Sequence, residues 1–195
     1  MPVRKYMVDI VATQTARQNG DKGMDFLAVV SQRSDAPVTV GVISPIVDQF
    51  TDTGDKPSLI LPPPATVEFV VPEDYAGVRF EAAVNLDQSS LWAIPPEVKG
   101  LPVTYRVRVD GDVRWETTFE HGPPRAGWSC DHMVWRHIEE DGQLGLPVEP
   151  GQTVRLETEL AGDLDPEMFS ADQLKLGFGG AALVQSQRKP RRVPT

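Results

Sequence analysis

The stretch that decides the fold runs from Val103 to Phe119 and reads VTYRVRV, then DGD, then VRWETTF. Its apolar residues lie at odd-numbered positions in both arms, whereas its arginines and its glutamate lie at even-numbered positions. A period of two is that of a β-strand with one buried and one solvent-exposed face, and such strands are typical of antiparallel sheets. The stretch therefore predicts a β-hairpin within a sheet protein.

The same alternation predicts the length of the hairpin loop. A two-residue Asp-Gly turn would set Val107 opposite Arg114 and mix the two faces. A three-residue Asp-Gly-Asp loop keeps the faces consistent, because it sets Val107 opposite Trp115 and Arg106 opposite Glu116. We therefore expect a three-residue loop, with Trp115 on the buried face.

The composition favours many short strands in one domain. The chain has 195 residues, 40% of them hydrophobic, which allows one fairly large domain with a full core. Its 18 prolines and 16 glycines fall between apolar runs and predict turns between short strands. A single cysteine, Cys130, excludes a disulfide within the chain.

Charge and hydropathy narrow the classes of partner. The formal net charge is −9, and an acidic body repels phosphate backbones, so no nucleic-acid partner is expected. No apolar run approaches the roughly 18 residues that cross a bilayer, so membrane insertion is not expected either. Asp9 interrupts the apolar part of the N-terminus, which makes it a poor signal peptide. We therefore expect a cytoplasmic location for the chain as given, with an earlier-removed leader left open.

The pattern along the chain predicts three parts. Residues 1–57 read as an N-terminal extension that is partly strand and packs on or beside the core. Residues 58–185 hold the cleanest alternation and predict an all-β, antiparallel two-sheet sandwich. Residues 186–195 form a basic, flexible tail that could contact an acidic partner through Arg188, Lys189, Arg191 and Arg192.

A series of segments gives the sandwich a family resemblance. The sequence reads PPPATVEF at 62–69, AGVRF at 76–80, the hairpin arm at 103–111, PGQTVRLETEL at 150–160 and GFGGAALV at 177–184. In this order the segments resemble bacterial jelly-roll domains related to the NPCBM-type carbohydrate-binding modules. The resemblance implies a jelly-roll sandwich and the binding of a ligand or partner. In the last segment, the glycines after Phe178 also suggest a β-bulge or a close backbone approach.

The candidate ligand-binding residues lie in two long connections. Sugar binding needs aromatic faces flanked by carboxylates and amides, and the connections supply Trp92, Trp128 and Trp135, with Asp131 and Glu139 nearby. Alternatively, these rings plug the open ends of the sandwich or face a neighbouring subunit.

One short segment carries several side chains that can bind metal. Cys130, Asp131, His132 and His137 lie within eight residues, and zinc accepts sulfur, nitrogen and oxygen ligands together. Their spacing matches no strong metal signature, and the chain has no nucleophile elbow, phosphate loop or dinucleotide fingerprint. We therefore expect no cofactor and no enzyme activity.

Three hypotheses of function follow. The first is a non-catalytic binding or assembly protein, an accessory subunit of a larger complex, with a protein partner or a second copy of the chain. The second is a carbohydrate-binding module that acts through its loop tryptophans. The third is a metal-dependent enzyme on a β-scaffold.

Overall fold

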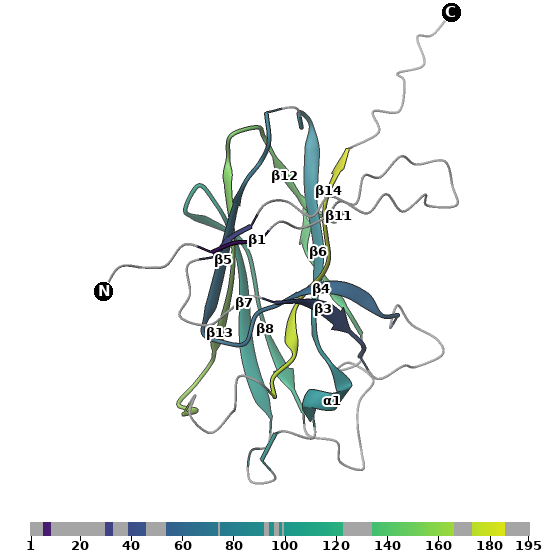
Figure 1. Ribbon diagram of the computed structural model, residues 1–195, viewed down its shortest axis with the longest axis vertical. Helices are drawn as coiled ribbons and strands as arrows, with labels where there is room; N and C mark the ends of the chain where they lie inside the picture. The colour runs from purple at the N-terminus through teal and green to yellow at the C-terminus, as the bar shows by residue number, and fades with distance from the viewer. Residues whose placement is uncertain are drawn as a thin grey trace, which may run out of the picture.

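Two antiparallel sheets face each other across the hydrophobic core (Figure 1). The computed structural model describes residues 6–8, 30–32, 39–45, 54–73, 75–91, 94–95, 98, 100–122, 134–165 and 173–185. The prediction of an all-β antiparallel sandwich is confirmed. No helix among the described residues is long and apolar enough to span a membrane.

Sheet 1 has six strands in the order β1-β2-β5-β13-β7-β8. Their bounds are Tyr6–Val8 for β1, Val30–Gln32 for β2, Ala65–Val70 for β5, Thr153–Leu160 for β13, Leu101–Val109 for β7 and Asp112–His121 for β8. The central strands bury alternate residues, as the period of two predicts, so one face of the sheet meets the core and the other meets solvent.

Sheet 2 has the strand order β12-β6-β14-β4-β3, and the short strand β9 also pairs with β6. The bounds are Leu146–Val148 for β12, Val78–Leu86 for β6, Leu176–Gln185 for β14, Lys56–Ile60 for β4, Thr39–Ile43 for β3 and Arg136–His137 for β9. A small hairpin, β10 (Glu139–Glu140) and β11 (Gln143–Leu144), lies between β9 and β12 in the chain. The one described helix, α1, spans Gln88–Leu91 and follows β6 directly.

The N-terminal part of the chain supplies strands to both sheets. β1 and β2 extend sheet 1 beside β5, and β3 extends sheet 2 beside β4. The predicted boundary between residues 57 and 58 falls inside β4. The basic tail, with Arg188, Lys189, Arg191 and Arg192, lies outside the described residues.

The β7–β8 hairpin has the predicted faces, but it reaches them through a shorter loop and a β-bulge. Val107 lies opposite Trp115 and Arg106 opposite Glu116, as predicted. The predicted three-residue loop is wrong, however, because Val109 pairs with Asp112 across a two-residue Asp110-Gly111 turn. Both turn residues have positive φ, 52° and 93°, as a type I′ Asp-Gly turn requires. A register shift after Val107 restores the faces, in the manner of a β-bulge.

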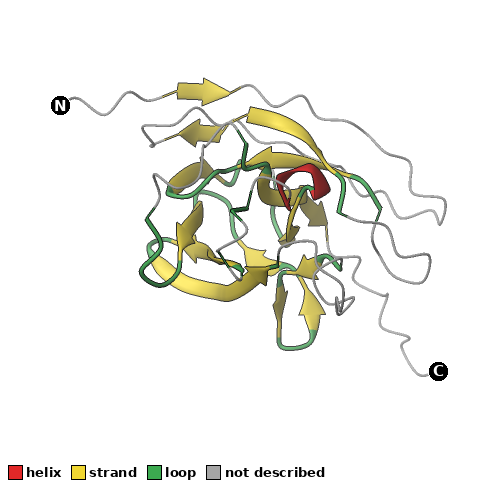
Figure 2. Ribbon diagram, turned by 90° about the horizontal axis from the view of Figure 1, so that it is seen from below, coloured by secondary structure: helices red, strands yellow, loops and turns green. Residues whose placement is uncertain are grey.

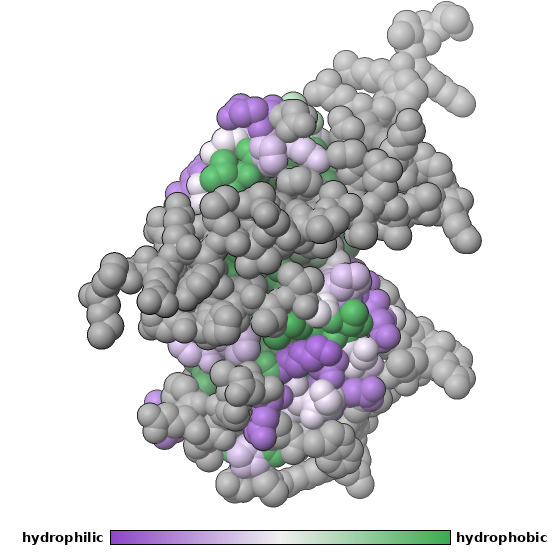
Figure 3. All heavy atoms as spheres, in the orientation of Figure 1, coloured by the Kyte–Doolittle hydropathy of each residue, from purple (hydrophilic) through white to green (hydrophobic). Residues whose placement is uncertain are grey.

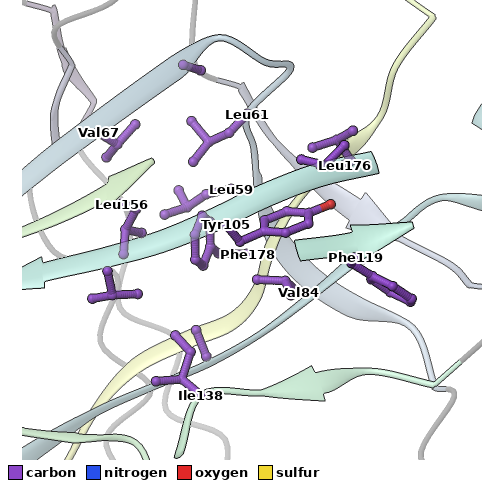
Figure 4. Close-up of a cluster of buried hydrophobic side chains, with 14 of the residues drawn as sticks. Leu59, Leu61, Val67, Val84, Tyr105, Phe119, Ile138, Leu156, Leu176 and Phe178 are labelled. Atoms are coloured by element: carbon purple, nitrogen blue, oxygen red, sulfur yellow. The ribbon is translucent and has the colours of Figure 1, made fainter. Parts of the chain in front are cut away.

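The core lies between the inner faces of the sheets (Figure 4). Tyr105 and Phe119 of sheet 1 are fully buried there with Phe178 of sheet 2, and the rings of Tyr105 and Phe178 meet edge to face with centroids 5.8 Å apart. Trp115 is partly buried and packs against this core, whereas Val113, beside the turn, is 45% exposed.

Ion pairs cover the outer face of sheet 1. Arg106 pairs with Glu116 of β8 and, at 2.7 Å, with Glu159 of β13. Arg108 pairs with Glu157 at 3.1 Å, and Arg155 pairs with Glu68. The hydrogen bonds that Arg106 donates to Glu159 and Glu116 raise the pKa of Arg106 above its ordinary value. Pairs that are largely open to solvent, such as Arg106 with Glu116 and Glu159, contribute about 0–1 kcal/mol each.

Candidate functional site

The candidate site lies at the end of the sandwich where β6 leads into α1, which we call the α1 end. The register pairs Leu101 with His121, so the start of β7 and the end of β8 lie side by side. On the facing sheet, Leu176 at the start of β14 lies beside Leu86 at the end of β6. Figure 2 views the molecule from this end, with α1 in red.

Asp87 organises the chain at the α1 end. Its carboxylate accepts hydrogen bonds from the backbone N–H of Ser89, at 3.0 Å, and from the Ser89 hydroxyl, at 2.5 Å, which is the pattern of a helix N-cap. The same carboxylate accepts the N–H of Ser44 at 2.9 Å, and the N–H of Gln88 donates to the Ser44 carbonyl. The residue after β3 is thereby tied to the start of α1.

The surroundings of Asp87 favour its ionised form. Burial acts to raise the pKa of the Asp87 carboxyl, but the hydrogen bonds from Ser89 and Ser44 and the charge of Lys175 outweigh burial, and the pKa is lowered. The Lys175 ammonium lies 3.4 Å from Asp87 Oδ2 and is 41% exposed. The Ser90 hydroxyl accepts the N–H of Lys175 at 2.7 Å. Asp87 is therefore ionised, and both of its carboxylate oxygens already accept hydrogen bonds from Ser44 and Ser89.

Asn85 adds a buried polar group on the outer side of sheet 2. Its side-chain oxygen accepts the N–H of Leu86 at 2.7 Å, and the residue is 1% exposed. Within the described part of the chain, its Nδ2 has no hydrogen-bond acceptor. A buried amide donor without an acceptor costs free energy of about 1–3 kcal/mol.

Trp135 is buried against the outer face of sheet 2. It is 2% exposed, and its indole N–H donates to the carbonyl of Gly54 at 2.8 Å. Its ring covers Gly179 so closely that a Cβ there would lie 2.5 Å from the ring carbon Cη2. The Lys56 ammonium lies 5.5 Å from the ring centroid. The apolar neighbours that complete this second cluster are Ile43, Ile60 and Ala83.

The burial of Trp135 corrects one sequence-based expectation. A sugar stacks on an open ring face, and Trp135 presents none, so its predicted role as a ligand platform is wrong in this structure. The alternative, a ring that plugs the sandwich, describes its position better. The glycines after Phe178 were the available signal: the structure has both the suspected register shift, after Gly179, and the close approach of Trp135.

The other candidate residues are not brought together in the described part of the chain. Glu139 is exposed on β10, opposite Leu144, whereas His137 is half-buried on β9, opposite Ala83. Among the described residues, no group of three or more histidine, cysteine, aspartate or glutamate side chains could hold a metal ion. Trp92, Trp128, Cys130, Asp131 and His132 lie outside the described residues.

Described residues next to the two tryptophan-bearing connections do lie at the α1 end. The stretch with Trp92 follows Leu91, the last residue of α1, and leads to Leu101 at the start of β7. The stretch with Trp128 follows the end of β8 and leads to Arg136, which pairs with Val84 near the end of β6. Both connections therefore start and finish at one end of the sandwich.

Sequence reasoning missed a buried polar pair at the same end. The Tyr105 hydroxyl and His121 Nε2 lie 2.8 Å apart, and both side chains are buried. Burial raises the pKa of Tyr105 well above its ordinary value. The period of two predicts that Tyr105 lies on the inner face. Its partner lies 16 residues further along the chain, beyond Phe119, where the alternating pattern ends.

Comparison with known proteins identifies a shared fold. No family model matches this sequence, and no curated protein does. A solved structure from Clostridium perfringens, the M60 catalytic domain of ZmpB with its CBM51-1 and CBM51-2 domains, is similar with a TM-score of 0.52 and 18% identity. The match covers 94% of this chain but only 15% of that one. The protein thus shares the β-sandwich fold of a structure that contains carbohydrate-binding modules.

Two further structures show weaker similarity. The CBM51 of a Clostridium perfringens GH95 protein, in complex with methyl-galactose, has a TM-score of 0.46 and 13% identity over 81% of this chain and 89% of that one. The tandem CBM51 modules of the family 98 glycoside hydrolase Sp3GH98 from Streptococcus pneumoniae have a TM-score of 0.44 and 16% identity, over 93% of this chain and 45% of that one.

Proposed function

We propose that the protein is a carbohydrate-binding module with its sugar site at the α1 end of the sandwich. The observation that carries the proposal is the convergence of the connections holding Trp92 and Trp128 on that end. The shared fold supports the carbohydrate-binding hypothesis over the accessory-subunit hypothesis, which no observation specifically supports.

The described residues of the α1 end supply groups that suit a sugar. Gln88 and Ser89 are exposed on α1, and the Lys175 ammonium is partly exposed beside them. The Gln88 amide and the Lys175 ammonium can donate to sugar hydroxyl oxygens, and the Ser89 oxygen, whose proton is donated to Asp87, can accept a hydrogen bond from a sugar hydroxyl. Asp87 fixes the backbone that carries Gln88 and Ser89. Tryptophan faces would cover the apolar side of a pyranose ring.

A glycan array followed by isothermal titration calorimetry tests the proposal. We expect at least one glycan to bind, and the Trp92→Ala or Trp128→Ala variant to weaken its binding by about tenfold or more. Trp115→Ala is the matched control, because this partly buried tryptophan lies on β8 beside the Asp110-Gly111 turn, at the opposite end of the strand from His121. Binding to no glycan, or an equal loss in all three variants, would contradict the proposal.

A further inference from the structure

β3 is an outer strand of sheet 2 with an uncharged edge. Among the described strands it pairs with β4 on one side, and no described strand pairs with the other. Its five residues, TVGVI, include no charge and no proline. Val42 is 46% exposed and lies opposite Pro57, which is also exposed. In Figure 3, hydrophobic side chains gather over the region where Figure 1 shows β3 and β4.

The ladder between β3 and β4 shows which backbone groups face the open edge. The N–H of Leu61 donates to the Leu176 carbonyl, so odd-numbered residues of this segment direct their hydrogen bonds to β14. Even-numbered residues of β4 therefore bond β3, and their partners there are Thr39, Gly41 and Ile43. Pro57 fits this alternation, since it has no N–H to donate. The backbone N–H and C=O groups of Val40 and Val42 consequently point away from β4.

Other outer strands are protected in ways that β3 is not. β8 carries Asp112, Arg114, Glu116 and Glu120, and its Thr118 carbonyl accepts a hydrogen bond from Arg136. β12 contains Pro147, and β1 is only three residues long. Charges, proline and short length are the usual means by which a sheet edge avoids pairing with another chain. An edge without them is suited to strand addition.

We propose that β3 pairs antiparallel with β3 of a second copy of this chain, about a two-fold axis at Gly41. This register sets Val40 opposite the partner's Val42, and Val42 opposite the partner's Val40. Each of these pairs exchanges two backbone hydrogen bonds, which uses all the outward groups of both strands. The central pair of glycines has no side chain to hinder the close approach of a non-hydrogen-bonded pair, and the same edge is used by both copies, as a two-fold interface requires.

The size of the contact sets its strength. Two paired strands of five residues bury well under the roughly 1,200 Å² that a stable protein interface needs. The dimer is therefore weak and forms as the protein concentration rises. An acidic chain of net charge −9 repels its own copies, so an uncharged edge is where two copies can meet.

Sedimentation velocity over a range of protein concentrations tests the proposal. The mass should rise from monomer towards dimer, and Val42→Lys should raise the dissociation constant by about tenfold or more. Val70→Lys is the control, because Val70 is 57% exposed but lies on β5, between β2 and β13. Circular dichroism confirms that both variants fold. A monomer at every concentration, or an equal effect of the two substitutions, would overturn the proposal.

Hydrogen exchange gives a readout specific to the backbone. At high protein concentration the amides of Val40 and Val42 should gain protection, while those of Gly41 and Ile43, which face β4, should be protected at every concentration. Dimerisation without added protection at Val40 and Val42 would also overturn the proposal, because the copies would then meet elsewhere.

Discussion

The hydroxyl of Tyr105 lies 2.8 Å from Nε2 of His121, and both side chains are buried between the sheets. Phe119 packs on the His121 ring with centroids 4.2 Å apart, and the Arg136 guanidinium lies 4.2 Å from the centre of the Phe119 ring. A polar pair inside an aromatic cluster thus fixes the end of β8, from which the connection with Trp128 departs.

Tyr105→Phe should lower the free energy of unfolding at pH 8 by about 1–2 kcal/mol, because it removes this hydrogen bond while keeping the ring. Burial raises the pKa of Tyr105, so the folded state favours the neutral phenol. That stability is present below the ordinary pKa of about 10 and is lost as the pH rises further towards the folded-state pKa. Urea titrations from pH 8 to 11 should show a steeper alkaline loss in the wild type than in the variant. Parallel curves would contradict this assignment.

Asp87→Asn should destabilise the protein at pH 7 by about 1–3 kcal/mol, because an amide cannot accept all the hydrogen bonds from Ser44 and Ser89. The pKa of Asp87 is lowered in the folded state, so its contribution is present above the ordinary value of about 3.9 and is lost as the pH falls through the folded-state value. Acid titration should show this loss in the wild type and less of it in the variant. Asp112→Asn, at an exposed position, should leave the stability at pH 7 unchanged; a similar loss there would contradict the role of Asp87.

Gly179→Ala should destabilise the fold by about 1–3 kcal/mol, since the new Cβ would overlap the Trp135 ring. Adding Trp135→Phe should recover part of this loss, because a smaller ring leaves room for the methyl group. Gly41→Ala is the matched control: its Cβ would meet Ile60 at an ordinary 3.5 Å. Thermal unfolding of the four proteins gives the comparison. Equal losses at Gly179 and Gly41 would show that the contact with Trp135 is not the cause.

Asn85→Leu should change the free energy of unfolding little, because two effects oppose each other. The substitution removes a buried donor that has no acceptor in the described part of the chain, but it also removes the oxygen that accepts the N–H of Leu86. Chemical denaturation measures the change. A loss above about 2 kcal/mol would show that the amide makes a bond that the described contacts do not include.

The alternation of residues was enough to predict much of the sandwich. It placed Tyr105 and Phe119 on the inner face and paired Val107 with Trp115, because alternate residues of a strand face the core. It misjudged the hairpin loop, since a bulge can restore the register after a turn of any length.

The candidate site was less accessible to sequence reasoning. The sequence does not separate Trp135 from the other loop tryptophans, because its burial depends on Gly179, which is 44 positions away in the chain, and on the carbonyl of Gly54. The role of Asp87 likewise rests on Ser44 and Lys175, from two other parts of the chain. Contacts between distant segments of the chain determine whether such residues are buried, and the alternation along one strand does not predict these contacts.

The position of a bound sugar tests the account most directly. A ¹⁵N–¹H NMR titration with the best ligand from the glycan array would follow the backbone amides of both ends of the sandwich. The account predicts shifts at Ser89, Gly122 and Lys175 at the α1 end, with Gly111 and Gly151 unchanged. Shifts confined to Gly111 and Gly151, or none anywhere, would contradict a sugar site at the α1 end.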